Sequence, residues 1–157
     1  SGGHLDSAMP ATIARLQVPY VMMHMRGTPR TVTRQNQYED ICGDLVDYFS
    51  DGIRRFRELG VNDLIIDPGF GFAKHPAQGF ELLRRLDELQ VLDCPLMAGL
   101  SRKSMLYQTL GTGPEEALNA TTAVNMLALE RGALILRVHD VREAVETAKI
   151  FTTLHQN

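Results

Sequence analysis

Several features that mark membrane, secreted or nucleic-acid-binding proteins are absent from the sequence. No apolar run approaches the roughly 18 to 20 residues that cross a bilayer, and the first residues do not join a basic stretch to an apolar signal core. The formal net charge of −3 at pH 7 provides no basic surface for a phosphate backbone. These absences predict a soluble, cytoplasmic protein that does not bind nucleic acid.

Cysteine is scarce, and the common catalytic signatures are missing. Cys42 and Cys94 lie far apart, without CxxC spacing or a nearby histidine cluster, so neither a zinc site nor a disulfide framework is indicated. Both are expected to be buried thiols. The sequence also has no GxGxxG turn after a strand, no P-loop and no nucleophile elbow. A dinucleotide-binding sheet is therefore disfavoured.

The sequence instead contains four apolar segments that alternate with amphipathic ones. With 44% hydrophobic and 22% charged residues, the 157 residues suit one globular unit. Apolar residues at steps of three and four predict helices. Strands are expected at 18–25, within 61–72, at 94–99 and at 133–140; helices are expected from Asp6 or Ser7 to about 17, at 35–59, 77–90, within 100–110, at 113–132 and at 141–154.

The strand pattern predicts an α/β fold. Strands that are apolar throughout require a parallel sheet covered by helices. Glycines and polar residues follow these strands, as they do at the catalytic face of a (β/α)8 TIM barrel, which usually needs about 250 residues. Residues 1–157 are therefore expected to form one structural unit that amounts to about half of such a barrel.

The ends of the expected strands carry most of the chemically informative side chains. The carboxylate of Asp67 could accept hydrogen bonds from a guanidine-like heterocycle, and Gly69 and Gly71 would let the backbone approach a flat ligand. Alternatively, Asp67 only forms a turn before Pro68. Phe72 could form one wall of an aromatic site, although a lone phenylalanine is more often part of the core.

Arg137 and His139 end the last expected strand. Residues two apart on a strand face the same side, so Val138 should face the opposite way. Two donors before a helix N-terminus suit a phosphate or pyrophosphate. The alternative is an ion pair between Arg137 and Asp140, with His139 acting as a helix cap.

The segment "SRKS" places Ser101, Arg102, Lys103 and Ser104 before a short expected helix. Hydroxyls and helix N–H groups there suit a carboxylate or phosphate, although a solvated basic loop is the alternative. His24 lies within an apolar strand and is expected to be a core residue. The other histidines are expected at the surface: His4, His75 and His155.

Together, "DPGFGFAK", "GLSRKSM" and "ILRVHDV", with "VMMHMRGTP" upstream, resemble the motifs of the dihydropteroate synthase family over essentially the whole chain. The resemblance implies a (β/α)8 barrel of which this chain forms the C-terminal half, strands five to eight. It also implies a transferase of folate biosynthesis that joins p-aminobenzoate to a dihydropterin pyrophosphate and releases pyrophosphate. Ala73 and His75 occupy positions where the family often has glycine and threonine or asparagine.

The resemblance further assigns roles to the strand-end residues. Asp67 would hold the pyrimidine edge of the pterin, Lys103 would donate to its ring, and Met23 would pack against it. Arg137 would stack on the pterin and, with His139, bind the pyrophosphate. Lys103, Arg137 and His139 would be the catalytic residues.

The second substrate, the metal and the partners also follow from the resemblance. Ser104 would receive the carboxylate of p-aminobenzoate, and Gly71, Phe72 and Arg102 would line its pocket. Mg²⁺ would bind the pyrophosphate, with its protein ligand in the N-terminal half of the barrel and none in this chain. A homodimer is expected through helices that include residues 120–133, although core packing explains their apolar pattern equally well.

Half a barrel would leave two sheet edges open. The chain is therefore expected to be a fragment of a longer enzyme, a product of proteolysis, or a half that completes its barrel with a second copy, and to be inactive alone. Two further functions stay open. One is another pterin-binding barrel, such as the methyltetrahydrofolate-binding methyltransferases, although "SRKS" and "RVHD" together favour the synthase. The other is a pterin- or phosphate-binding fragment without turnover.

Overall fold

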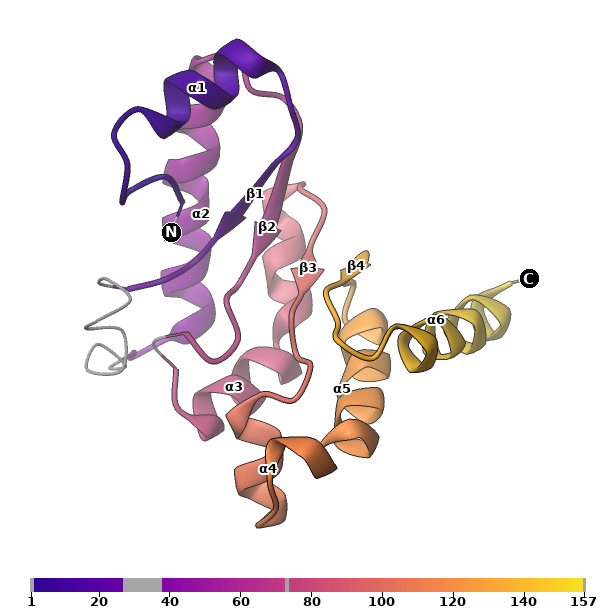
Figure 1. Ribbon diagram of the computed structural model, residues 1–157. Helices are drawn as coiled ribbons and strands as arrows, with labels where there is room; N and C mark the ends of the chain where they lie inside the picture. The colour runs from indigo at the N-terminus through magenta and orange to yellow at the C-terminus, as the bar shows by residue number, and fades with distance from the viewer. Residues whose placement is uncertain (1, 27–37, 73, 157) are drawn as a thin grey trace.

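The computed structural model describes residues 2–26, 38–72 and 74–156 (Figure 1). Helices and strands alternate along the chain, as the sequence predicts. Their order is α1 (Met9–Leu16), β1 (Tyr20–Met23), α2 (Ile41–Glu58), β2 (Leu64–Asp67), α3 (Pro76–Arg84), the 3₁₀ helix η2 (Leu86–Leu92), β3 (Met97–Ala98), α4 (Ser104–Leu110), the 3₁₀ helix η3 (Pro114–Glu116), α5 (Leu118–Glu130), β4 (Ile135–Leu136) and α6 (Val141–His155).

The four strands are parallel, and each lies beside the next one in the sequence (Figure 1). β1 pairs with β2 in a register that places Met23 opposite Asp67. A parallel bridge between Ile66 and Leu96 joins this pair to the pair formed by β3 and β4. The predicted parallel order is therefore confirmed, and the carboxyl ends of the strands lie at one edge.

β3 and β4 are shorter than predicted because their ladder is irregular at both ends. At its start, the N–H groups of Leu134 and Ile135 both donate to the carbonyl of Leu96. Further along, Arg137 N–H donates to the carbonyl of Ala98. The next available donor, His139 N–H, bonds to the hydroxyl of Ser101 rather than to a backbone carbonyl. The side chain therefore ends the ladder where the site begins.

The helices differ from the prediction mainly at their boundaries. The helix predicted at 77–90 is divided into α3 and the 3₁₀ helix η2. Buried Leu83, Leu86, Leu89 and Leu92 recur every three residues, which matches the three residues per turn of a 3₁₀ helix rather than the α-helical repeat. The helix predicted at 113–132 is likewise divided into η3 and α5, and α1 begins at Met9.

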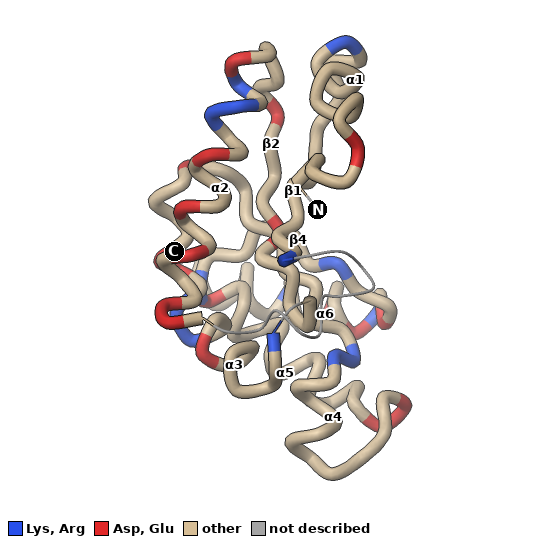
Figure 2. Tube along the Cα trace, turned by 90° about the vertical axis from the view of Figure 1, so that its left-hand side faces the viewer, with Lys and Arg blue, Asp and Glu red and all other residues tan. Residues whose placement is uncertain are grey.

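Helix α2 supplies much of the core. Its apolar stripe is buried at Ile41, Leu45, Phe49, Ile53 and Phe56, as the periodicity predicts. Asp44 lies in its first turn and Arg55 and Arg57 in its last turn, positions that suit the helix dipole, and charged residues of both signs lie along the helix (Figure 2). Within the described ranges, the hydrophobic cluster is continuous from β1 to α5.

The cysteines differ in burial. Both are free thiols; Cys42 is buried, as expected, whereas Cys94 is only half-buried because it precedes β3 at the amino-terminal edge of the sheet. The expectation that both are buried is therefore wrong for Cys94. None of the described helices combines the length and apolar character needed to cross a bilayer.

Replacing Phe49 with Ala should lower the free energy of unfolding by about 3–5 kcal/mol, because truncating a fully buried ring removes its contacts and leaves a cavity. Urea unfolding followed by circular dichroism would measure the loss. Phe80→Ala makes the same change on a partly exposed ring of α3 and should cost less than about half as much. Equal losses in the two variants would contradict this description of the core.

Candidate functional site

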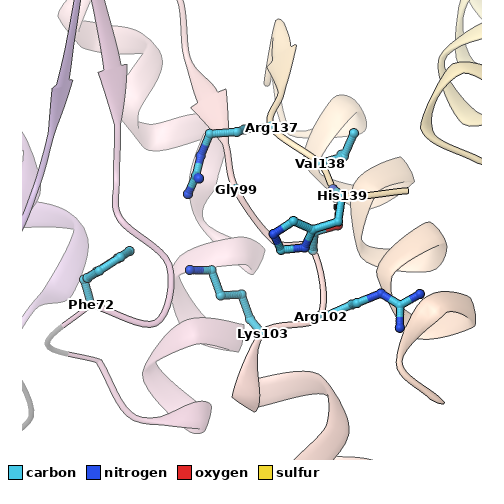
Figure 3. Close-up of a pocket in the computed structure, with 8 residues that line it drawn as sticks. Phe72, Gly99, Arg102, Lys103, Arg137, Val138 and His139 are labelled. Atoms are coloured by element: carbon cyan, nitrogen blue, oxygen red, sulfur yellow. Dashed lines mark hydrogen bonds between the residues drawn. The ribbon is translucent and has the colours of Figure 1, made fainter. Parts of the chain in front are cut away.

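A cavity of about 350 Å³ lies at the carboxyl ends of β3 and β4 (Figure 3). Residues from three of the four predicted strand ends line it. They are Phe72, Gly99, Ser101, Arg102, Lys103, Arg137, Val138 and His139. The structure thus gathers five of the predicted site residues around one space: Phe72, Arg102, Lys103, Arg137 and His139.

Arg137 and His139 project to the same side of the chain, and Val138 points the other way (Figure 3). The alternation predicted from the sequence is therefore correct. A glycine makes room for the arginine, since a Cβ at position 99 would lie 3.0 Å from Nη2 of Arg137. A side chain at position 99 would therefore require the guanidinium to shift by a few tenths of an ångström.

Lys103 faces Arg137 and His139 across the cavity (Figure 3). Its Nζ lies 4.6 Å from the centre of the Phe72 ring, a cation–π contact. Burial, followed by the charge of Arg137, lowers the pKa of Lys103, and Asp67 opposes this shift. A Cβ at Gly71 would lie 3.2 Å from the lysine Cδ, so the glycine also allows this close approach. Three basic side chains thus meet at one cavity.

Asp67 is buried behind the cavity, at the end of β2. Its Oδ1 accepts the N–H of Gly69 at 2.8 Å, so the alternative role of forming the turn is realised. Burial raises the pKa of Asp67, against the opposing effects of the Gly69 N–H and of three cations, of which Arg137 is the strongest. Asp67 is therefore a buried carboxylate that holds the turn and lies outside the lining of the cavity.

Arg102 lines the cavity but directs its guanidinium away from it (Figure 3). The guanidinium donates to both carboxylate oxygens of Asp140 at 2.8 and 2.9 Å, and to the carbonyls of Pro114 and Glu115. This pair lowers the pKa of Asp140. Asp140 therefore pairs with Arg102 and not, as the alternative held, with Arg137, and "SRKS" is not simply a solvated loop.

The remaining predicted site residues lie outside the lining of this cavity. Met23 is half-buried opposite Asp67 in the sheet, and Ser104 is the first residue of α4. Gly71 contacts Lys103 from the neighbouring turn. His4, His75 and His155 are exposed, as expected, and Ala73 falls outside the described residues.

His24 is buried, which confirms the expectation of a core histidine, but its partner was not predicted. Lys74 is also buried, and its Nζ lies 3.0 Å from Nδ1 of His24. Burial lowers the pKa of Lys74 to about 7 and that of His24 to about 3. The feature of the sequence that could have indicated this pair is the lysine directly after the glycine-rich segment "DPGFGFA".

The described residues do not provide a metal site. No group of three or more histidine, cysteine or acidic side chains occurs among them in an arrangement that could hold a metal ion. Around the cavity, Asp140 is paired with Arg102, and the oxygen of Asp67 that forms the turn already accepts an N–H. The basic side chains suit an anionic ligand instead.

Comparison with known proteins identifies relatives of the chain. The family model described as "Pterin binding enzyme" matches residues 1–139. The dihydropteroate synthase of Escherichia coli (strain K12) is 40% identical over 139 residues, which are 87% of this chain and 49% of the relative. This chain spans about half the length of the curated relatives it matches.

Two solved structures share the fold. Dihydropteroate synthase from Thermus thermophilus in complex with 6HMPPP matches with a TM-score of 0.93 and 34% identity, over 99% of this chain and 62% of that chain. Xanthomonas albilineans dihydropteroate synthase with 4-aminobenzoic acid matches with a TM-score of 0.89 and 34% identity, over 97% and 55% of the two chains. The chain belongs to the family of pterin binding enzymes, as the resemblance of its strand-end motifs implied.

Proposed function

We propose that the cavity binds a dihydropterin pyrophosphate, and that residues 1–157 are the C-terminal half, strands five to eight, of a (β/α)8 barrel that condenses this substrate with p-aminobenzoate. The convergence of Lys103, Arg137 and His139 beside buried Asp67 carries the proposal. The named relatives are dihydropteroate synthases, and two are described with 6HMPPP or 4-aminobenzoic acid. These names favour the synthase over another pterin-binding barrel.

Arg137 and His139 are proposed to hold the diphosphate. An arginine offers a fork of N–H donors that matches phosphate oxygens, and both side chains project to the same side of the cavity. When the bond between the pterin methylene carbon and the pyrophosphate oxygen breaks, negative charge grows on the leaving group. Donors that are already in place stabilise this charge more than that of the ground state, so they lower the barrier.

The pterin ring is proposed to lie between Asp67, Lys103 and Met23. An ionised carboxylate has about four acceptor positions, so Asp67 can bind two ring N–H groups while it still accepts the N–H of Gly69. Lys103 can donate to ring acceptors from its position above Phe72. The amine nitrogen of p-aminobenzoate then forms the new bond to carbon and releases its proton, without need of a strong general base.

The p-aminobenzoate is proposed to bind beside Phe72, Gly71 and Ser104. Arg102 contributes to this side indirectly, because its bonds to Asp140 and to two backbone carbonyls tie three loops together. The expected Mg²⁺ would bind the pyrophosphate and, as the family resemblance implies, take its protein ligand from the N-terminal half of the barrel. The residues of this chain bind and orient the two substrates.

Lys103→Ala and Arg137→Ala should each lower turnover by at least about tenfold, or roughly 1.4 kcal/mol of barrier, because each removes a cation that faces the proposed substrate. The assay follows condensation of dihydropterin pyrophosphate with p-aminobenzoate, using this chain and the full-length protein that carries it. Arg142→Ala removes an exposed arginine of α6 and should leave turnover unchanged. Undiminished turnover in either site variant of the full-length enzyme would refute the assignment.

A homodimer through α5 and α6 is part of the proposal. The two helices pack on each other, and an open groove of about 320 Å³ lies between them. Several large apolar side chains on these helices are exposed. They are Leu127, Val141, Val145, Ile150 and Leu154. A second copy that covers them would remove this apolar surface from water.

Ile150→Glu should raise the dissociation constant of the dimer at least about tenfold, because it would bury a charge in the apolar contact. Sedimentation velocity over a concentration series would measure the change. Val91→Glu also introduces a glutamate, at an exposed valine of η2 outside the proposed contact, and should leave the dimer intact. A monomeric wild-type chain, or equal weakening by both variants, would contradict this contact.

A further inference from the structure

Lys74 occupies an unusual position for a lysine. Its side chain is buried. Among the described residues its Nζ contacts three groups, none of them a carboxylate: Nδ1 of His24 at 3.0 Å and the carbonyls of Gly69 and Phe72 at 3.2 and 3.1 Å. An ammonium carries three donors, so each N–H has one acceptor. Burying an ammonium among neutral acceptors costs free energy. This cost indicates that Lys74 has a role beyond packing in the core.

The contact with His24 fixes the state of the histidine. The charged form of Lys74 can only donate, so opposite it Nδ1 of His24 accepts and the ring proton lies on Nε2. Burial first, and then the charges of Lys74 and Arg26, lower the pKa of His24 to about 3, so the ring is neutral over the physiological range. The neutral ring of His24 can therefore accept a hydrogen bond from Lys74.

The same lysine joins two segments that shape the pterin side of the cavity. His24 follows β1, and its N–H donates to the carbonyl of Asp67 at 2.9 Å. Gly69 packs so closely on the carbonyl of His24 that a Cβ there would lie only 2.2 Å from the oxygen. Lys74 closes this arrangement from the other side by binding the carbonyls of Gly69 and Phe72.

The opposite side of the cavity is held by different contacts. His139 N–H is bound by the Ser101 hydroxyl, and Arg137 N–H by the carbonyl of Ala98. The contacts of Arg102 with Asp140 complete that side. The charges that act on the Lys74 pKa are those of Asp67 and Arg26. These hydrogen bonds share no residue with those of Lys74.

We propose that Lys74, anchored by His24, is a positioning residue that fixes the turn from Asp67 to Phe72 and thereby the pterin-binding side of the cavity, but not its diphosphate-binding side. This assignment rests on the proposed function, because it takes Asp67 and Phe72 as contacts of the substrates. Lys74 itself does not touch the substrate; it acts through the turn. Its removal would leave buried acceptors without donors and release the turn.

Lys74→Met keeps the length of the side chain and removes the three donors. Isothermal titration calorimetry on this chain would use two probes, the dihydropterin alcohol without phosphate and inorganic pyrophosphate. The variant should raise the dissociation constant of the pterin at least about tenfold and change that of pyrophosphate by no more than about twofold. Equal weakening of both probes by a variant that is still folded would overturn the proposal. Lys149→Met, on an exposed lysine of α6, should change neither.

A matched pair at position 24 tests the anchor if Lys74→Met fails to fold. The side-chain oxygen of Asn can take the place of Nδ1, whereas Leu has similar bulk and no acceptor. His24→Asn should retain pterin affinity and His24→Leu should lose it, again without loss of pyrophosphate affinity. Equal affinities of the two variants for the pterin would overturn the role of His24 as the anchor.

The same titrations separate this assignment from the proposed function. If the wild-type chain binds neither probe, the proposed function fails and this assignment with it. If the wild-type chain binds the pterin and Lys74→Met binds it equally well, only this assignment fails.

The pH dependence of stability provides a test that needs no ligand. The groups that face Lys74 are His24, Asp67, Arg26 and Tyr38. Its pKa of about 7 lies below the value of about 10.4 in an unfolded chain. The folded state therefore binds fewer protons between these values, and stability rises with pH across that window. The stability of the wild type relative to Lys74→Met should increase from pH 7 to pH 10; a constant difference would place Lys74 in solvent and overturn its contacts.

Discussion

The parallel alignment of the four strands is the constraint on which the site depends. Because all strands run in one direction, the residues that follow them meet at one edge of the sheet. The register that sets Met23 opposite Asp67 also brings His24 over the turn at Gly69. A shift of one residue in that pairing would move Asp67 to the other face and separate it from Lys103 and Arg137.

The charge balance at this edge explains which ligand it suits. Three basic side chains surround the cavity, and the carboxylate behind it, that of Asp67, is buried and partly engaged by its own turn. Burial works against each charge, as the lowered pKa of Lys103 and the raised pKa of Asp67 show. A ligand that carries an anionic end and a hydrogen-bonding heterocyclic end would relieve both costs at once, because it would supply partners to cations and acid together.

Much of this arrangement could be predicted from the sequence, since the alternation of apolar segments indicated the parallel order and "R-V-H" indicated the direction of Arg137 and His139. The division of α3 from η2 was missed because leucines three apart also fit an amphipathic α-helix over a short span. The contacts of Arg102 and Lys74 could not be predicted. Their acceptors are carbonyls and side chains that no local pattern specifies, and several come from distant segments.

Asp140 pairs with Arg102 and not with Arg137, so the positive charge of Arg137 at the cavity is not neutralised by this carboxylate. Arg102 has a left-handed backbone with φ of +52°, which costs roughly 1–2 kcal/mol for a residue with a Cβ. The bidentate pair with Asp140 and the two carbonyl contacts offset this cost. With Asp140 engaged, Arg137 has no need to turn toward it. The strained backbone at position 102 therefore accompanies an arrangement in which the guanidinium of Arg137 stays at the cavity.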